Sequence, residues 1–397
     1  MPRLADRIEQ LTESQTIAMA QLSRELQAQG LDIISLSLGE PDFITPEVIR
    51  EGAKKAIDEG YTKYSPIAGF LDLRQAICDK FKNENGLDYT PDQIVVSTGA
   101  KQSIANVVLC LINPGDEVVV PAPFWVSYSQ IIKLAGGIPV YIPTTVESDY
   151  KVSPEQLEAA ITPKTRMLIF SSPCNPSGTV YSKSELEGIA KVVQKYDDLY
   201  IVSDEIYEHI NFGGKHESIA SFDFIRDRVI IINGVSKGYA MTGWRIGYIG
   251  APTWIAKACD KMQGQFTSGT SSISQRAALA ALKSGGAFFA EMCNTYRRRR
   301  DLVVDALRKI PGLKVNVPLG AFYVFPDVSG FFGKTDGATV INNPNDLSMY
   351  LLRDAQVAVV TGEAFGDDHC IRISYATSDE LLTKAMDRIT RSLGKLR

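Results

Sequence analysis

The sequence has few of the residues that build metal centres. It contains only three histidines, His209, His216 and His369, and no two of them stand at the spacing of zinc ligands. Its six cysteines are dispersed and include no C-x-x-C pair. We therefore expect no metal ion, and we expect reduced thiols of the kind found in cytoplasmic proteins.

Long apolar runs and a strong charge of one sign are also missing. No run approaches the roughly 20 apolar residues that span a bilayer, and residues 1–15 lack the apolar core of a secretory signal. A net charge of −4 gives no basic footprint for nucleic acid or for an anionic membrane. We expect a cytoplasmic protein with neither of these partners.

What the sequence does contain is an alternation of short apolar runs with helical patterns. Almost wholly apolar strands separated by helices indicate an α/β fold, with a mostly parallel sheet covered by helices on both faces. The 397 residues, 45% of them hydrophobic, provide enough core for two domains. Seven runs are expected to be the strands of this sheet: Ile94–Ser97, Glu117–Pro121, Ile138–Ile142, Met167–Phe170, Tyr200–Ser203, Val229–Ile232 and Ile246–Ile249.

The pattern changes near residue 285. A long helix over 288–309 is followed by short strands and helices of an α+β type. We expect an N-terminal arm at 1–45 that begins with one helix over 6–29, a large domain at 46–285 and a small domain at 286–397. Four consecutive arginines, Arg297–Arg300, would point all round the long helix, so we expect them on a solvated face.

Lys237 is the first candidate for chemistry. It stands between Ser236 and Gly238, soon after the expected strand Val229–Ile232, and Arg245 follows eight residues later. An amine that attacks a carbonyl must lose its proton, which desolvation or nearby cations promote. The placement suits a Schiff-base lysine for pyridoxal phosphate, with the arginine on the phosphate. Taken alone, a surface lysine in a loop is the more common case.

Other polar and aromatic residues also follow expected strands, where ligands of open parallel sheets bind. Asp204 could pair with a protonated pyridine nitrogen, and Tyr207 could reach the phenolic oxygen of the same ring. Asn175 lies on a proline-flanked loop, and Trp125 could stack on a planar ring.

The run Gly99–Gln102 begins a helix directly after strand Ile94–Ser97, where free N–H groups favour a phosphate. Each of these residues has an ordinary alternative: a helix cap, a turn asparagine, a core aromatic or a plain helix start. Their order, each at a strand end, favours a cofactor site.

Eight sequence runs resemble the class I aminotransferases of fold type I, in the branch of the bacterial aspartate aminotransferases. They cover nearly the whole chain. The resemblance implies pyridoxal 5′-phosphate as cofactor, a homodimer, and ping-pong exchange of an amino group between L-aspartate and 2-oxoglutarate. The runs are G-E-P-D-F (39–43), Y-S-P (64–66), T-G-A-K-Q (98–102), F-W-V-S-Y (124–128), N-P-S-G (175–178), S-D-E-I-Y (203–207), S-K-G-Y-A-M-T-G-W-R-I-G-Y (236–248) and R-I-S-Y-A (372–376).

The resemblance also implies a role for each site residue. Lys237 would bind the cofactor covalently and then move a proton. Asp204 would hold the ring nitrogen protonated, Tyr207 and Asn175 would bond the phenolic oxygen, and Trp125 would stack on the ring. The phosphate group would be bound by the run Gly99–Lys101, Ser236, Arg245 and, from a second subunit, Tyr64. The α-carboxylate of the substrate would be bound by Arg372, Asn175 and the backbone of Gly39, beside Trp125.

The substrate is left open by these runs. Lys101 would bind the distal carboxylate of an acidic amino acid, and its ordinary alternative is a solvent-facing lysine. Thr16 together with Lys101 resembles a subgroup that also transaminates prephenate, so prephenate or an aromatic substrate is the first alternative. A lyase or a cyclopropane-forming synthase on the same scaffold is the second. A cofactor-binding DNA regulator is the third, and it would need an additional basic module.

Overall fold

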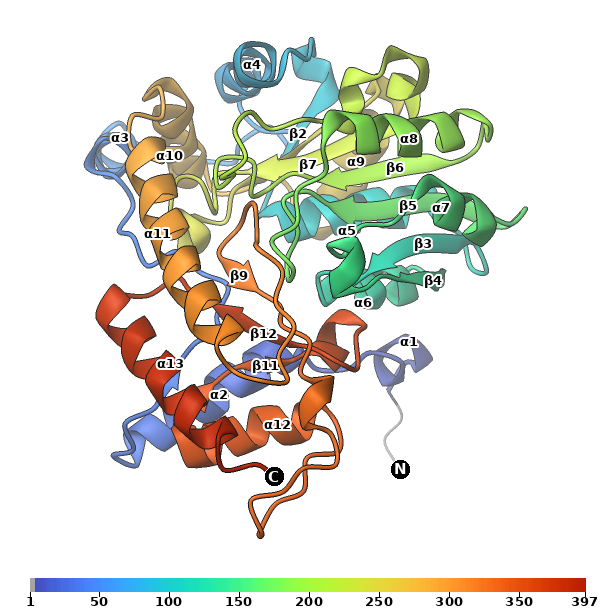
Figure 1. The fold of residues 1–397 in the computed structure, drawn as a ribbon. Coiled ribbons are helices and arrows are strands. Elements are labelled where there is room, and N and C mark those ends of the chain that lie inside the picture. Colours follow the sequence, from blue (N-terminus) through green and yellow to red (C-terminus); the bar gives the residue numbers. More distant parts are fainter. Residues whose placement is uncertain (1–3) are drawn as a thin grey trace.

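A seven-stranded sheet forms the centre of the computed structural model, which describes residues 4–397 (Figure 1). All neighbouring strands are parallel except β8, which runs antiparallel to both β2 and β7. The expected α/β fold with a mostly parallel sheet is therefore confirmed. In spatial order the strands are β2 (Ile94–Ser97), β8 (Gly247–Gly250), β7 (Val229–Gly234), β6 (Tyr200–Asp204), β5 (Thr165–Ser171), β3 (Glu117–Ala122) and β4 (Ile138–Pro143).

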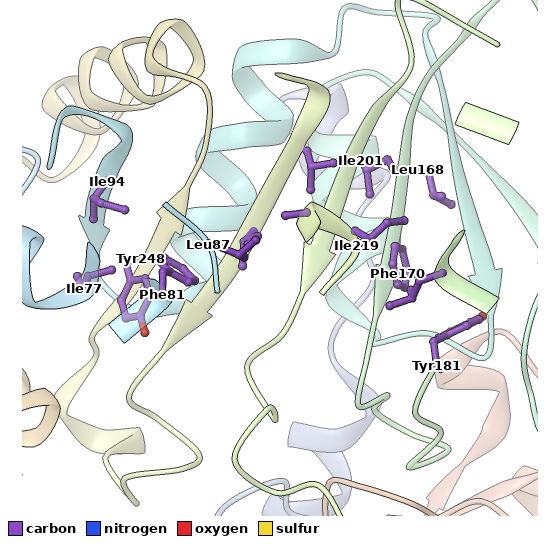
Figure 2. Close-up of a cluster of buried hydrophobic side chains, with 14 of the residues drawn as sticks. Ile77, Phe81, Leu87, Ile94, Leu168, Phe170, Tyr181, Ile201, Ile219 and Tyr248 are labelled. Carbon is purple, nitrogen blue, oxygen red and sulfur yellow. The ribbon is translucent and has the colours of Figure 1, made fainter. Parts of the chain in front are cut away.

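Helices cover both faces of the sheet because alternate strand residues point to opposite sides. Val96 packs into one hydrophobic cluster and its neighbour Val95 into another. The first cluster, part of which is drawn in Figure 2, joins the sheet to α3 (Glu47–Asp58), α4 (Leu71–Lys80), α7 (Pro154–Ala160), α8 (Lys183–Gln194) and α10 (Ser272–Lys283). The second joins it to α5 (Ala100–Leu111), α6 (Ser127–Leu134) and α9 (Thr253–Phe266).

The C-terminal elements build a separate hydrophobic cluster below the sheet (Figure 1). Within it β9, β12 and β11 form a three-stranded antiparallel sheet, and β1 (Ile34–Ser35) pairs with β10. Phe289 packs against both this cluster and the main core. The elements are α11 (Phe289–Arg308), β9 (Tyr323–Val324), α12 (Pro344–Tyr350), β10 (Val357–Ala358), β11 (Val360–Thr361), β12 (Ile371–Ser374) and α13 (Asp379–Leu393).

The N-terminal helix differs from its prediction. The helix expected over 6–29 is two helices, α1 (Asp6–Glu9) and α2 (Gln15–Ala28). The chain leaves the helical path between them, where the backbone N–H of Thr12 donates to the Gln130 side chain at 3.1 Å. Short turns of 3₁₀ or π helix lie at Phe81–Asn85, Pro91–Gln93, Val146–Ser148, Ile219–Ser221, Asp223–Arg228, Thr242–Trp244, Ser329–Phe331, Leu351–Ala355 and Gly362–Phe365.

The solvated face expected for Arg297–Arg300 is wrong for two of the four side chains. Arg299 and Arg300 are only 9% and 11% exposed. Each guanidinium finds oxygen partners, which buried charges require: Arg299 reaches Asp42 and Asp379, and Arg300 reaches the carbonyl of Pro318. Among residues 4–397 no helix has both the length and the apolarity to cross a membrane.

Candidate active site

A cavity of about 360 Å³ lies where β5, β6 and β7 end, below the sheet and against the C-terminal elements. The carboxyl ends of parallel strands meet at one edge, so their following loops converge there. Twelve of the residues singled out in the sequence line this cavity. They are Thr16, Gly39, Ala100, Lys101, Trp125, Asn175, Asp204, Tyr207, Ser236, Lys237, Arg245 and Arg372.

Lys237 extends from the loop after β7 into the cavity. Its amine donates a hydrogen bond to the carbonyl of Gly39 at 2.5 Å and lies 5.5 Å from the centre of the Tyr207 ring. Burial lowers the pKa of the lysine to about 8; Glu40 opposes this shift, and the positive charges of Arg372 and Arg245 add to it. Lys237 is therefore much closer to a free amine at neutral pH than an ordinary lysine.

This lowered pKa predicts the pH dependence of amine capture. Only the unprotonated amine attacks an aldehyde, so the rate at Lys237 should rise with pH and reach half its maximum near pH 8. Ordinary surface lysines, with pKa values of about 10.4, should still be gaining reactivity well above that pH. Reductive labelling of the cofactor-free protein with a small aldehyde, followed for each peptide by mass spectrometry, measures the pH profile of Lys237 and those of the surface lysines. A Lys237 profile that coincides with the surface profile contradicts the prediction.

Asp204 ends β6 as a buried carboxylate. Tyr128, fully buried on α6, donates its hydroxyl to Asp204 Oδ2 at 2.6 Å, and the N–H of Ile206 donates to Oδ1 at 3.3 Å. Burial nevertheless raises the pKa of Asp204 to about 6. Keeping a buried aspartate ionised costs free energy, and a cation that arrives with the ligand would offset this cost.

Arg245 and the start of α5 form a second part of the cavity wall. Arg245 adopts the left-handed conformation with φ 58°, and its guanidinium donates to the carbonyls of Thr242 and Thr98. Gly99, with φ 85°, lies so close that a side chain there would clash with this guanidinium. The free N–H groups at the N-terminus of α5 and the Arg245 cation face the same space, with Ser236 beside them, which suits a phosphate.

Arg372 lies on β12 and is 2% exposed. Its guanidinium donates to Asn175 Oδ1 at 3.0 Å and to the carbonyl of Ser37, while its Nε has no partner among residues 4–397. Among residues 4–397 no carboxylate lies within ion-pair distance of Arg372. A buried guanidinium with an unused donor, facing a cavity, is built to receive an anion.

Two tyrosines of the site were not singled out by the sequence. Tyr128 is the partner of Asp204, and Tyr323 on β9 shares a hydrogen bond of 2.7 Å with the Tyr207 hydroxyl. Tyr128 belongs to the run F-W-V-S-Y, three residues after Trp125, but it was assigned no role of its own from the sequence. No local pattern pointed to Tyr323, whose contact spans 116 residues of chain.

Lys101 and Trp125 form the remaining wall. The Lys101 ammonium lies 5.1 Å from the centre of the Trp125 ring. Burial, and then the charge of Arg245, lower the pKa of Lys101. The cavity thus holds four cationic side chains, Lys101, Lys237, Arg245 and Arg372, against two carboxylates, Asp204 and Glu40.

Tyr64 is the one predicted site residue that lies clearly away from the cavity of its own chain. Its side chain is 99% exposed, and it does not line the cavity. Its expected role, binding the cofactor phosphate of a second subunit, stays a prediction.

Comparison with known proteins identifies the relatives of this chain. A family model described as aminotransferase class I and II matches residues 31–389. A Petunia hybrida protein named bifunctional aspartate aminotransferase and glutamate/aspartate-prephenate aminotransferase is 49% identical, over 98% of this chain and 82% of its own length. The aspartate/prephenate aminotransferase of Cereibacter sphaeroides is 46% identical, over 98% of both chains.

Solved structures agree with these relatives. The aspartate aminotransferase from Rhizobium meliloti superposes with a TM-score of 0.97 at 42% identity, covering all of both chains. The Thermus thermophilus aspartate aminotransferase with maleate superposes with a TM-score of 0.93 at 40% identity, covering 99% of this chain and 100% of that one.

Proposed function

We propose that this chain, which belongs to the class I and II aminotransferases, transfers the amino group of L-aspartate to 2-oxoglutarate, giving oxaloacetate and L-glutamate. One observation carries this proposal: the cavity holds four cationic side chains against two carboxylates. Such an excess suits ligands with several anionic groups, namely a phosphorylated cofactor and a dicarboxylic substrate.

We propose pyridoxal 5′-phosphate as the cofactor, because the residues present fit each part of it. Lys237 offers an amine of lowered pKa to the aldehyde, and Asp204 offers a buried carboxylate to the ring nitrogen. The start of α5, Ser236 and Arg245 would hold the phosphate. Tyr207 and the amide of Asn175 would bond the phenolic oxygen, and Trp125 would stack on the ring.

The cofactor supplies an aldehyde that binds amines and a protonated ring that stabilises negative charge on the substrate Cα. Lys237 would hold the cofactor through its aldehyde until the amino donor arrives, and its freed amine would then take the proton from the substrate Cα and deliver it to the former aldehyde carbon of the cofactor. Asp204 would keep the ring nitrogen protonated, so that positive charge lies near the place where negative charge develops. The donor would leave as a 2-oxo acid by reaction with water while its amino group stays on the cofactor, and the second substrate would take up that amino group by the reverse sequence.

Two cations would orient the substrate. Arg372 would bind the α-carboxylate with its fork of N–H donors, replacing the carbonyl of Ser37, while Asn175 and the backbone of Gly39 complete that side. Lys101, across the cavity above Trp125, would bind the distal carboxylate. We further propose that residues 286–397, which carry Arg372, close as a domain with the arm at 1–45 over residues 46–285 and exclude water.

The role of Lys101 predicts a change of specificity. The Lys101→Met variant should lower kcat/KM for aspartate by about 10- to 100-fold, since it loses one hydrogen bond to a charged group. The kcat/KM for an aromatic amino acid, which has no distal carboxylate, should change little. Parallel steady-state assays with both donors measure the ratio. Equal losses for both donors would show that Lys101 acts on the cofactor side instead.

A prephenate aminotransferase activity is the second candidate. Thr16 and Lys101 line the same cavity, and both relatives described above carry prephenate in their names. Steady-state rates with glutamate as donor and either oxaloacetate or prephenate as acceptor separate the two functions. The absence of any oxaloacetate activity would overturn the aspartate proposal.

We also propose a cytoplasmic homodimer in which Tyr64 of each chain reaches the phosphate of the other. It is supported by the 99% exposure of this side chain and by six free cysteines. A mixture of Lys237→Ala and Tyr64→Phe proteins, dissociated and reassembled, should then regain activity, because each hybrid dimer contains one intact site. Random pairing makes half of the dimers hybrids, so about one quarter of the wild-type activity is expected. A mixture that is no more active than its two separate components contradicts the shared site.

The visible spectrum of the purified protein tests the central proposal. Protein loaded with pyridoxal phosphate should absorb in the visible range, and aspartate alone should remove this band with release of one 2-oxo acid per site. 2-Oxoglutarate should restore the band. Continuous release of ammonia without an acceptor would instead identify a lyase.

A further inference from the structure

One strap of backbone, residues 37–45, contacts two of the four cationic side chains that line the cavity, Arg372 and Lys237. The carbonyl of Ser37 accepts a hydrogen bond from Arg372, and the carbonyl of Gly39 accepts one from Lys237. At Gly39 the strap passes so close to Tyr323 that a side chain there would clash with its hydroxyl. The strap therefore sets where these two cations lie before a ligand arrives.

The strap is tied alternately to the two halves of the molecule. Glu40 accepts a hydrogen bond from Thr242, and Thr45 donates to the carbonyl of Ala240 at 2.6 Å, both in the loop that carries Lys237. Between these ties Asp42 turns the other way, toward α11, a helix that runs from beside α10 to the C-terminal elements (Figure 1).

The contact of Asp42 is an ion pair with a buried arginine. Arg299 Nη1 donates to Asp42 Oδ1 at 2.9 Å, and Arg299 Nε donates to Asp379, at the start of α13, at 3.1 Å. The Tyr296 ring packs edge-on against Phe43 with centroids 5.5 Å apart. A guanidinium with 9% exposure has few other positions open to it, so the strap is held against α11 and α13 together.

We propose that Asp42 and Arg299 are positioning residues for amino transfer: their ion pair fixes the strap, and the strap fixes Arg372 and the Gly39 backbone for the substrate carboxylate. The proposal rests on the proposed function, since it assigns how the carboxylate site of that function is held in place. If the strap is not fixed, Arg372 and Gly39 are less well placed for a carboxylate. The protein should then bind carboxylic acid ligands with lower affinity.

The neighbouring Arg298 provides a matched control. It also pairs with Asp379, at 2.7 and 3.1 Å, but it is 61% exposed and forms no hydrogen bond or ion pair with the strap. Arg298→Gln therefore weakens the hold on Asp379 while leaving Asp42 paired.

The test is the dissociation constant of maleate, a dicarboxylate without an amino group, measured on cofactor-loaded protein by its effect on the visible spectrum. Asp42→Asn and Arg299→Gln should each raise this constant about tenfold, and the double variant should raise it no further, because both changes break the same pair. Arg298→Gln should change it less than about twofold. Asp42→Asn is isosteric and carries the test alone if Arg299→Gln does not fold.

Two results would overturn the proposal. One is an Arg299→Gln or Asp42→Asn protein that binds maleate as Arg298→Gln does. The other is a double variant whose loss is the product of the single losses, about a hundredfold, which would mean that the two residues act separately. If the wild-type protein itself fails to bind pyridoxal phosphate or to transfer amino groups, the proposed function fails first, and the two failures are thereby distinguished.

Discussion

The Lys237→Ala variant should fold, bind the cofactor without a covalent bond, and lose amino transfer by a factor on the order of 10⁶, the size seen when a covalent catalytic residue is removed from another enzyme. The lysine is expected to serve twice, as the amine that binds the aldehyde and as the base that moves the Cα proton. No other amine replaces it, since Lys101 lies against Trp125 on another wall of the cavity. The rate of oxaloacetate formation from aspartate and 2-oxoglutarate measures the loss.

The control for this variant is another lysine of the same cavity. Lys101→Met also removes one positive charge, but it keeps the amine at position 237. After reduction with borohydride, mass spectrometry should find the cofactor attached to the peptide containing Lys237 in the wild type and in Lys101→Met, and absent from Lys237→Ala. Attachment to any other lysine of the wild-type protein would remove the basis of the assignment.

Much of the sheet could be predicted because its signals are local. Seven short apolar runs correspond to β2–β8, with ends displaced by at most two residues. The strand ends in turn located Asp204 and Lys237, since the loops after parallel strands converge on one edge. The antiparallel direction of β8 left no local mark, because a buried strand is apolar in either direction.

What escaped prediction depends on contacts between distant parts of the chain. Tyr323 meets Tyr207 across 116 residues, and Arg299 meets Asp42 across 257. The run Arg297–Arg300 looks like a solvated face by its spacing alone. Arg299 is buried and Arg300 is largely covered, because the strap, α13 and the loop near Pro318 supply oxygen partners at that place. Periodicity describes one helix, whereas burial also depends on what packs against it.

Replacement of Asp204 by asparagine should have the second-largest effect. The amide is nearly isosteric but neutral, so it cannot hold a proton on the ring nitrogen. The negative charge that develops on the substrate Cα then loses its nearest compensation, and kcat/KM for aspartate should fall about 10³-fold. Cofactor loading, measured by the visible spectrum, should remain detectable because Lys237 and the phosphate site are intact. A variant with more than a tenth of the wild-type kcat/KM would rule out this role for Asp204.

Tyr128→Phe provides a graded companion to that variant. Its hydroxyl donates to Asp204 Oδ2 at 2.6 Å, a bond that favours the ionised carboxylate. Burial already raises the pKa of Asp204 to about 6, and loss of the bond should raise it further. Since Asp204 acts only when ionised, activity should be lost on the acid side at a higher pH than in the wild type, with about a tenfold loss or less near neutral pH. A kcat/KM profile against pH measures the shift. A uniform loss at every pH would instead mean that Tyr128 merely fills space beside Asp204.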